Sequence, residues 1–338
     1  MENKKIKEEV EENAIIKITK SELDEGIKQG KKMINNINFY ENEGITIGSF
    51  GEENSGRRLY LANIIKNDTN YLGLLNNRLK REALGLSQLK SGDKYFGFYS
   101  KDIRSGNGIY LFKPVKTGNK IITEIHWGMW KDNKMNGKGT YLWLKEDENK
   151  NSFNDYDSAD FDIFSGIFKD SKYNYGVYMS KKKDSYYVYY GNMDDKGNRT
   201  GDECYYYNSD EDKLLYGKMK DNYFISTYLA VFDDEGALSD LLLCEFDDNH
   251  NIINYTEFDS IDNDSMENIK AKVTNFRFSI LKVDYFGNAF NMFKNIVKDI
   301  KTIKIENFIS EVDYPKLISK LSYYSQLGIF ETIKNNLI

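Results

Sequence analysis

Two segments of the chain share one pattern of glycine and aromatic residues, and this pattern limits the possible folds more than any other feature. The first runs from Tyr95 to Phe112 and the second from His126 to Trp143. They align without a gap as aromatic-x-Gly-x-aromatic, a six-residue link, Gly-x-Gly and then x-aromatic-x-aromatic. Such an internal repeat indicates an array of one small structural unit rather than a single globular core.

The spacing within each segment predicts a β-hairpin. Residues two apart in a strand share a face, so Tyr95, Gly97 and Tyr99 should lie on one side of the first strand. By the same rule Gly106, Gly108 and Tyr110 share one face of the second strand, after a polar turn in the six-residue link. The glycines leave a trough in which a cross-strand aromatic ring can lie. Each such contact contributes roughly 0.2–1 kcal/mol.

Looser copies of the pattern extend the array in both directions. Their first glycines are separated by 25, 24, 31, 38, 25 and 26 residues, and the two long gaps hold polar insertions at Lys116–Asn119 and Lys145–Asp160. The copy around Gly73 matches the pattern least well. The residues expected to build the repeats are Tyr95, Gly97, Tyr99, Gly106, Gly108, Tyr110, Trp127, Gly128, Trp130, Gly137, Gly139, Tyr141, Trp143, Gly166, Phe168, Gly176, Gly191, Gly201, Tyr205 and Gly217.

This pattern resembles that of the MORN-repeat (membrane occupation and recognition nexus) family, roughly YxGxWxxGxxxGxGxYxY, over about two-thirds of the chain. The resemblance implies a mainly β fold, an elongated antiparallel meander of MORN-type β-hairpin repeats, and residue periodicity adds an α-helical C-terminal segment. About seven copies, two of them strong, would occupy residues 39–258. Residues 1–38 form a charged tail with a short helix near Glu22–Asn35, and residues 259–338 form the helical region.

The C-terminal region changes to helical periodicity. Ile269, Val273, Phe276 and Ile280 recur at intervals of three or four residues, which predicts an amphipathic helix. Similar spacing follows from Phe290, and Pro315 suits the first turn of a further helix. Before this region, Leu241–Phe246 and Ile252–Phe258 predict one more hairpin. The helices could cap the end of the sheet, or dock a partner or a membrane surface.

The charge is unevenly distributed, although the chain as a whole carries only −6. Residues 265–338 hold 11 Lys and Arg against 7 Asp and Glu, residues 1–36 are balanced, and the middle therefore carries about −10. A net acidic chain lacks the electrostatic footprint of a nucleic-acid-binding protein. An acidic sheet also disfavours binding to anionic headgroups. Any lipid or partner contact through basic residues is expected at Lys294, Lys298, Lys301 and Lys304.

Candidate motifs for chemistry are few, and we predict no catalytic, cofactor or metal site. Gly137-Lys138-Gly139-Thr140 lacks the spacing and context of a phosphate-binding loop. His126 takes the place of a repeat aromatic, and His250 lies in a polar turn. The two histidines and two cysteines have no metal-ligand spacing. Acids between Asp259 and Glu267 allow calcium binding but lack the EF-hand order, and helix capping explains them more simply.

These observations favour a non-enzymatic scaffold or adaptor. The start of the chain lacks a signal peptide, and Cys204 and Cys244 form no disulfide framework, so a cytoplasmic location is expected, with cytoskeletal or membrane association. The resemblance implies protein partners in a cytoskeletal, ciliary or membrane-associated complex, and homo-oligomers joined through repeats. Two alternatives remain open: a phosphoinositide-dependent membrane tether acting through the basic C-terminal helices, and a regulatory subunit of an enzyme complex.

Overall fold

The computed structural model describes residues 45–50, 59–66, 69–76, 78, 80–147, 160–256, 263–281, 287, 290–291 and 294–295. The predicted helices near Glu22–Asn35 and after Pro315 lie outside these residues. The described chain falls into two compact units. The first contains the residues up to Lys113 together with Met129–Lys134, and the second contains Pro114–Gly128 and the residues from Met135 onward.

The first unit is an antiparallel meander. Each strand pairs antiparallel with the next one along the chain. This order keeps contacts local, as stacked hairpins require. Its strands are β1 (Ile45–Phe50), β2 (Leu59–Lys66), β3 (Thr69–Leu75), β4 (Arg81–Gln88), β5 (Lys94–Ser100) and β6 (Ile103–Leu111).

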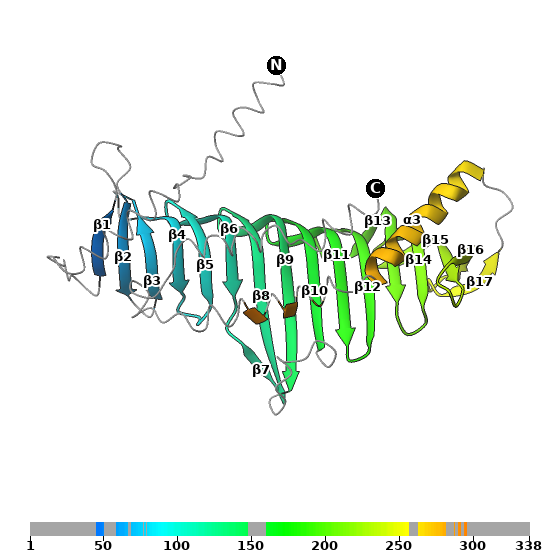
Figure 1. Cartoon of the computed structure of the whole chain (residues 1–338), viewed down its shortest axis with the longest axis horizontal. Coiled ribbons are helices and arrows are strands. Elements are labelled where there is room, and N and C mark those ends of the chain that lie inside the picture. Colours follow the sequence, from blue (N-terminus) through cyan, green and yellow to red (C-terminus); the bar gives the residue numbers. More distant parts are fainter. Residues whose placement is uncertain are drawn as a thin grey trace, which may run out of the picture. The chain divides into compact units, whose positions relative to one another are not determined.

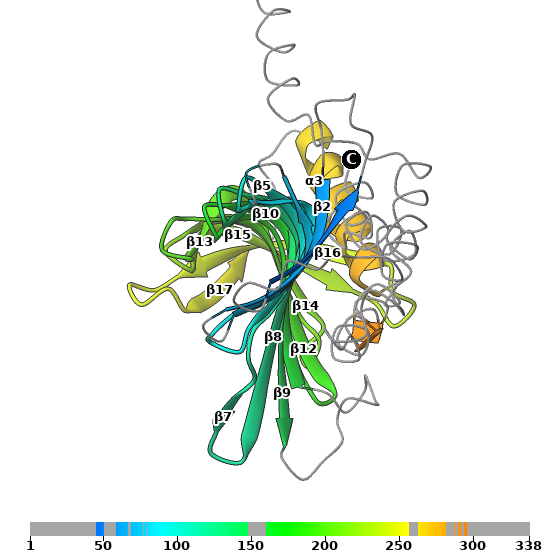
Figure 2. The same cartoon turned by 90° about the vertical axis from the view of Figure 1, so that its left-hand side faces the viewer.

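The second unit is also an antiparallel meander, and its last described element is a helix. Successive strands pair antiparallel, and Figure 2 shows them rotated relative to one another, as in other twisted sheets. The predicted last hairpin is present as β16 and β17, and the predicted fold class is confirmed. The elements are β7 (Val115–Thr117), β8 (Lys120–Lys131), β9 (Lys134–Asp147), β10 (Asp160–Lys169), β11 (Lys172–Lys182), β12 (Ser185–Met193), β13 (Arg199–Asn208), β14 (Lys213–Lys220), β15 (Tyr223–Phe232), β16 (Leu238–Phe246), β17 (Ile252–Thr256) and α3 (Asn263–Leu281).

The first predicted insertion forms a hairpin of its own. Gly118 and Asn119 make the turn between β7 and β8, whereas Lys116 and Thr117 belong to β7. Strand β7 and the outer parts of β8 and β9 project beyond the other strands (Figures 1 and 2). Gly118 adopts a φ of +63° in this turn, a left-handed conformation that glycine reaches without steric cost. Most of the second insertion, residues 148–159, lies outside the described residues.

The turns within the repeats are tighter than the sequence suggested. The six-residue link after Tyr99 contains a turn of only two residues, Lys101 and Asp102, and the remainder of the link belongs to the strands. Both turn residues have positive φ, which defines a type I′ turn and matches the twist of a hairpin. The same geometry recurs at the turns Asp132-Asn133, Asp170-Ser171 and Asp221-Asn222.

The expectation that Gly106 shares a face with Gly108 is wrong. A bulge separates the two residues, because Gly97 pairs with Gly108 whereas Tyr99 pairs with Arg104. Gly106 lies in this bulge with a φ of +76°. In the preceding hairpin, Ala83 occupies the corresponding place with a φ of +54°. The first glycine of Gly-x-Gly therefore permits the bulge, and only the second lies in the aromatic trough.

In the second unit, α3 covers the sheet face opposite the repeat glycines. Val273, Phe276 and Ile280 are almost fully buried along one side of the helix, as the periodicity predicted. The Phe276 ring stacks on Tyr205, with 4.6 Å between ring centroids. The helix contacts β13, β14 and β16 (Figure 1), so it lies across a face of the sheet and not over its end.

A candidate interaction surface

Glycine pairs create the predicted trough, and an aromatic ring fills it. Gly97 lies opposite Gly108 in the β5–β6 hairpin. A Cβ added at Gly97 would lie 2.5 Å from both the Gly108 Cα and the Tyr95 Oη. Tyr95 is fully buried, and its hydroxyl donates a hydrogen bond to the Phe98 carbonyl at 3.0 Å. The ring thus crosses its own strand and its neighbour at a point where no side chain could fit.

The copy judged weakest from sequence has the same geometry. Gly73 lies opposite Gly85 in the β3–β4 hairpin. A Cβ at either glycine would lie 2.6 Å from the Tyr71 Oη, which donates to the Leu74 carbonyl at 2.7 Å. Sequence reasoning missed Gly85. The signal for it was present, because Gly85 stands between Leu84 and Leu86, 12 residues after Gly73, close to the 11 residues that separate Gly97 from Gly108.

The second unit varies the residues in the trough. His126 lies against Gly139, Phe164 lies against Gly166 and Gly176, and Tyr189 lies against Gly191. The position opposite Gly191 is occupied by the buried Cys204, whose sulfur lies 3.5 Å from the Tyr189 hydroxyl. A small side chain replaces the second glycine again in the next hairpin, where Gly217 pairs with the buried Thr227.

The other predicted repeat residues make ring contacts, lie on the opposite face of the sheet, or are glycines with positive φ. Trp130 packs edge-on against Tyr95 with centroids 5.4 Å apart, and Tyr141 packs against Trp143 at 4.3 Å. Tyr205 is buried on the opposite sheet face, under α3. Trp127 is also buried, and because it stands between His126 and Gly128 in the strand, its side chain lies on the opposite face of the sheet. Tyr99, Tyr110 and Phe168 join the ring contacts, and Gly137 and Gly201 have positive φ, as Gly106 does.

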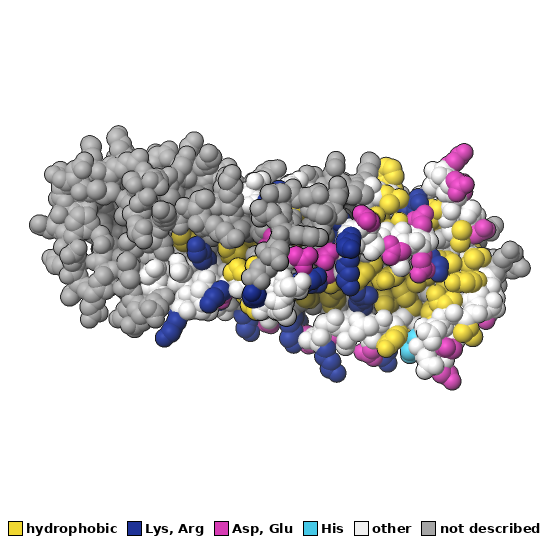
Figure 3. Space-filling model, turned by 90° about the horizontal axis from the view of Figure 1, so that it is seen from below, with side chains coloured by type: hydrophobic (Ala, Val, Ile, Leu, Met, Phe, Trp, Pro, Cys, Tyr) yellow, Lys and Arg dark blue, Asp and Glu magenta, His cyan; other side chains and the backbone are white. Residues whose placement is uncertain are grey.

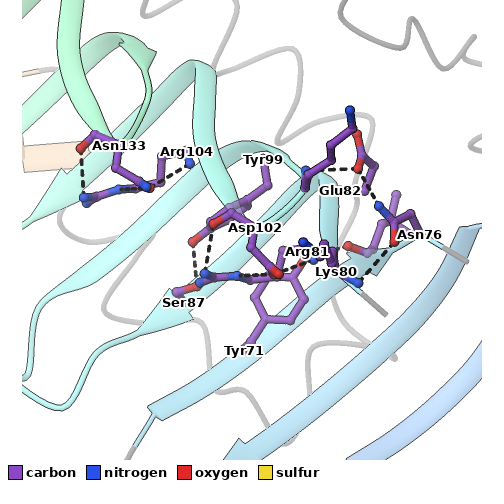
Figure 4. A network of polar contacts seen from close by, with 12 residues as sticks. Tyr71, Asn76, Lys80, Arg81, Glu82, Ser87, Tyr99, Asp102, Arg104 and Asn133 are labelled. Carbon is purple, nitrogen blue, oxygen red and sulfur yellow. Dashed lines mark hydrogen bonds and ion pairs between the residues drawn. The ribbon is translucent and has the colours of Figure 1, made fainter. Parts of the chain in front are cut away.

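Arginines brace three of the hairpin turns to the preceding hairpin, and sequence reasoning missed them; Figure 4 shows two of these arginines, Arg81 and Arg104. The Arg81 backbone N–H donates to the Asp102 carboxylate at 2.8 Å, and the Arg81 guanidinium donates to the Asp102 carbonyl at 3.0 Å. In return, the Asp102 N–H donates to the Arg81 carbonyl at 2.9 Å. The guanidinium carbon also lies 4.7 Å from the Tyr99 ring centroid, within range of a cation–π contact.

The same set of hydrogen bonds between an arginine and a turn residue, which we call a bracket, recurs in the next hairpin of this unit. The Arg104 N–H donates to the Asn133 side-chain oxygen at 2.9 Å, and the guanidinium donates to the Asn133 carbonyl at 3.0 Å. Its carbon lies 4.6 Å from the Trp130 ring centroid. Both arginines stand four residues before the second trough glycine, Gly85 or Gly108. This constant spacing was the available sequence signal.

A third bracket lies in the second unit. The Arg199 N–H donates to the Asn222 side-chain oxygen at 2.8 Å. The Arg199 guanidinium lies between 5.2 and 5.9 Å from the centroids of four tyrosine rings, of which Tyr189 is the nearest. Where Met135 replaces the arginine, only the backbone bracket remains, formed with Ser171.

The titratable side chains of the repeats that have shifted pKa values play structural roles. Burial lowers the pKa of His126 to about 3, and a backbone hydrogen bond with Thr140 offsets only part of this shift. Burial, followed by a hydrogen bond to Asp93, raises the pKa of Tyr110 to about 12. Neither group is poised to exchange protons near neutral pH. The part of the chain that the structure describes contains no cluster of potential metal ligands and no helix suited to span a membrane.

The predicted basic contact residues are only partly placed. Lys294 is partly buried, and Lys298, Lys301 and Lys304 lie outside the described residues. Nearby, the Phe290 ring stacks on Phe161, with 5.6 Å between centroids. The proposed lipid contact at these lysines therefore stays a prediction.

The glycine troughs, crossing aromatic rings and braced hairpin turns define a β-hairpin repeat protein. The MORN repeat family model matches residues 95–114 and 128–144, which include most of the two segments of closest internal similarity. The chain therefore contains MORN repeats at these two places. No curated protein matches it. MORN repeats are generally involved in protein–membrane or protein–protein interactions and are typically non-enzymatic, so the class of function is interaction.

Proposed function

We propose that this protein is a non-enzymatic scaffold or adaptor that holds protein partners in a cytoplasmic assembly of cytoskeletal, ciliary or membrane-associated type. The observation that carries the proposal is the bracing of the hairpin turns. The turn at Asn133 is hydrogen-bonded to Arg104 of the preceding hairpin, and the turn at Asp102 is bonded likewise to Arg81. The turns are therefore held at fixed positions on the sheet edge.

Fixed turns suit partner binding because little conformational entropy is lost when they are engaged. The braced turns also expose both apolar and charged side chains. Ile103 is 38% exposed and Met129 is 43% exposed, and each lies close in sequence to an exposed turn lysine, Lys101 or Lys131. Apolar anchors with charged neighbours are the usual composition of a protein-binding surface.

The aromatic face itself offers little room to a partner side chain. Tyr95, Tyr71 and Trp130 are each at most 5% exposed, since neighbouring rings and arginines already cover them. Their role is to make the array rigid. We therefore place partner contact along the braced turns and not within the troughs.

Purification of the complexes from cells that produce the protein, followed by lysine cross-linking and mass spectrometry, tests this proposal. Partner cross-links are expected at Lys101 and Lys131, beside the braced turns. Lys101→Glu/Lys131→Glu should lose those partners. Lys90→Glu/Lys113→Glu makes the same charge change at exposed lysines away from these turns and should retain them. Retention of every partner by both variants, or recovery of the protein as a partnerless monomer, would sink the proposal.

A further inference from the structure

The sheet face of the second unit that carries α3 is built from tyrosines on three neighbouring strands. Tyr190 pairs with Tyr205 across β12 and β13, and Tyr205 pairs with Tyr216 across β13 and β14. The ring centroids are 5.8 Å and 4.8 Å apart. These contacts lie within the sheet and do not involve the helix, so the aromatic surface is preorganised. We call the three tyrosines, together with the nearby acids Glu203 and Asp212, the helix-binding face.

The two acids of the helix-binding face are held in place by tyrosine hydroxyls. The Tyr207 hydroxyl donates a hydrogen bond to the Asp212 carboxylate at 2.9 Å, and the Tyr216 hydroxyl donates to the Glu203 carboxylate at 3.4 Å. Hydrogen bonds from a cation to such carboxylates are stronger than bonds between neutral groups. The face therefore presents two negative charges at fixed positions beside its aromatic rings.

Helix α3 shows which kind of ligand this face accepts. The Phe276 ring is fully buried and stacks on the tyrosines, with 4.6 Å between ring centroids. The Lys272 ammonium pairs with Glu203 at 2.5 Å, and the Arg277 guanidinium pairs with Asp212 at 2.9 Å. An amphipathic helix thus binds through one aromatic anchor and a cation on either side of it in the sequence.

The charge of α3 matches this surface poorly. Residues 185–256, which form β12 to β17, contain 5 Lys and Arg against 15 Asp and Glu, a net charge of −10. Asn263–Leu281 contains 3 Lys and Arg against 2 Asp and Glu, a net charge of +1. Figure 3 shows Asp and Glu side chains gathered among hydrophobic ones towards one end of the visible face. The helix therefore neutralises only a small part of the negative charge of these strands.

Further acids lie where the C-terminal half of α3 meets the turn between β15 and β16. The Arg277 guanidinium donates to a backbone carbonyl of this turn at 3.3 Å. Asp234 and Glu235 of the same turn are exposed. On the helix surface, the neighbours of Arg277 three and four residues away include two exposed and uncharged side chains, Thr274 and Leu281. A helix with cations at those two places would extend the ion pairing to this turn.

From these observations we propose that the helix-binding face binds a basic amphipathic helix of a protein partner, and that α3 occupies the face until such a helix displaces it. The sequence of α3 defines the chemistry of the partner helix: an aromatic anchor, a cation four residues before it and another directly after it. Additional cations supply the attraction that α3 lacks. They have to offset the high effective concentration of α3, which belongs to the same chain.

The surface and its occupant both differ from those discussed above. The helix-binding face is separate from the braced turns, so the proposal goes beyond the scaffold function and does not rest on it. An anionic membrane is a poor occupant, because the acidic strands repel its headgroups. A helix that carries both an aromatic anchor and cations satisfies the rings and the acids together.

Peptide binding to the purified full chain gives the first test. The probe, which we call the basic peptide, is a synthetic peptide of residues 263–281 with Thr274→Lys/Leu281→Lys, which raise its net charge from +1 to +3. Fluorescence anisotropy should show that it binds about tenfold more tightly than the peptide of unaltered sequence. The control probe carries Phe276→Ala in addition, keeps the charge of +3 and should bind about tenfold more weakly than the basic peptide. Equal binding of the two +3 peptides would overturn the proposal, because charge alone would then explain the attraction.

Removal of α3 from the face gives the second test. In the Phe276→Ala chain the helix no longer competes, so the basic peptide should bind about tenfold more tightly than it binds the unaltered chain. Adding Glu203→Lys/Asp212→Lys to this chain should abolish the gain. Adding Asp195→Lys/Asp248→Lys instead makes the same charge change at exposed turns at the other ends of the strands and should preserve it. Equal losses from the two charge changes would contradict the assignment of the peptide to this face.

Hydrogen exchange shows whether the peptide takes the place of α3. With saturating basic peptide, the amides of Asn263–Leu281 in the unaltered chain should lose protection, while those of β13 and β14 keep theirs. Protection of these two strands in each variant also verifies that the sheet is folded. The proposal is wrong if the basic peptide binds while α3 stays protected, or if it binds neither the unaltered chain nor the Phe276→Ala chain.

Discussion

Asn133 and Arg104 form a reciprocal pair across two neighbouring hairpins of the array. The Arg104 N–H donates to the Asn133 side-chain oxygen at 2.9 Å, and the Asn133 N–H donates to the Arg104 carbonyl at 3.2 Å. Asn133 also has a φ of +66°, which its turn requires. One residue therefore closes its own hairpin and attaches it to the preceding one. Stability in a repeat array depends on such nearest-neighbour terms.

Asn133→Ala should therefore destabilise the protein by about 1–3 kcal/mol, since it removes the hydrogen-bond acceptor and places alanine at positive φ. Asn133→Gly separates the two effects. Glycine lacks the acceptor but tolerates the φ, so its loss should be smaller. Asn133→Asp keeps the acceptor and should remain close to the unaltered protein. Urea unfolding midpoints measure all three, and equal midpoints for the alanine variant and the unaltered protein would contradict the bracket.

A side chain at a trough glycine should be far more damaging than one at an open glycine. Gly97→Ala places a Cβ 2.5 Å from the Gly108 Cα, a backbone atom that cannot move without separating the strands. We expect a loss of about 3 kcal/mol or more, at the upper end for single substitutions. Gly118→Ala is the control, because it has positive φ but nothing within 4 Å. It should cost only about 1 kcal/mol. Comparable losses in thermal scans would show that the trough is not tightly packed.

Local patterns explain which parts of this fold the sequence could predict. The pairing of Gly97 with Gly108 follows from the pattern within one hairpin, and the buried side of α3 around Phe276 follows from the periodicity of one helix. The Arg104–Asn133 bracket joins residues 29 positions apart, so the pattern within one hairpin does not reveal the partner of Arg104, although the spacing of Arg104 from Gly108 was visible in the sequence. The copy at Tyr71 was undervalued because its pattern carries leucines in place of other aromatics, although the glycine pair is intact.

Averaging hid a second feature that was present in the sequence. The value of −10 for the middle of the chain suggested a uniformly acidic sheet, whereas strands β3 to β9 are basic and β12 to β17 are acidic. Only the strand boundaries showed where to divide the count. The two-residue turns were likewise obscured by the polar link, because polar residues continue into the strands on both sides of Lys101 and Asp102.

His126 should make stability depend on pH below neutrality. Burial lowers its pKa from 6.5 to about 3 in the folded chain, so the unfolded chain binds the proton first as pH falls. Stability should be constant above about pH 6.5 and fall by on the order of 1.4 kcal/mol per unit below it. Between pH 6.5 and about 4.5, carboxylate protonation contributes little.

His126→Phe should remove this slope, because phenylalanine fills an equivalent trough at Phe164 and cannot be protonated. His250→Asn is the matched histidine control at an exposed turn and should retain it. Urea unfolding of the three proteins at several pH values gives the comparison. A slope that persists in His126→Phe would assign the pH dependence to another group.

Phe276 should determine whether α3 stays attached to the sheet. Its side chain is fully buried and stacks on Tyr205, whereas the pairs formed by Lys272 and Arg277 involve partners that are 62% and 49% exposed. Exposed ion pairs contribute about 0–1 kcal/mol each, but a buried phenylalanine contributes about 3–5 kcal/mol. Phe276→Ala should therefore release the helix. Most of the stability of a helix in a protein comes from packing of its apolar face, so release of α3 should also unfold it.

Hydrogen exchange detects this release directly. In Phe276→Ala, amides of Asn263–Leu281 should lose protection while those of β5 and β6 keep theirs, because the array does not depend on the helix for its strand pairing. Phe278→Ala removes the same side chain from a position that is 58% exposed and should leave the protection unchanged. If Lys272→Ala releases the helix and Phe276→Ala does not, charge and not aromatic packing holds α3 on the sheet.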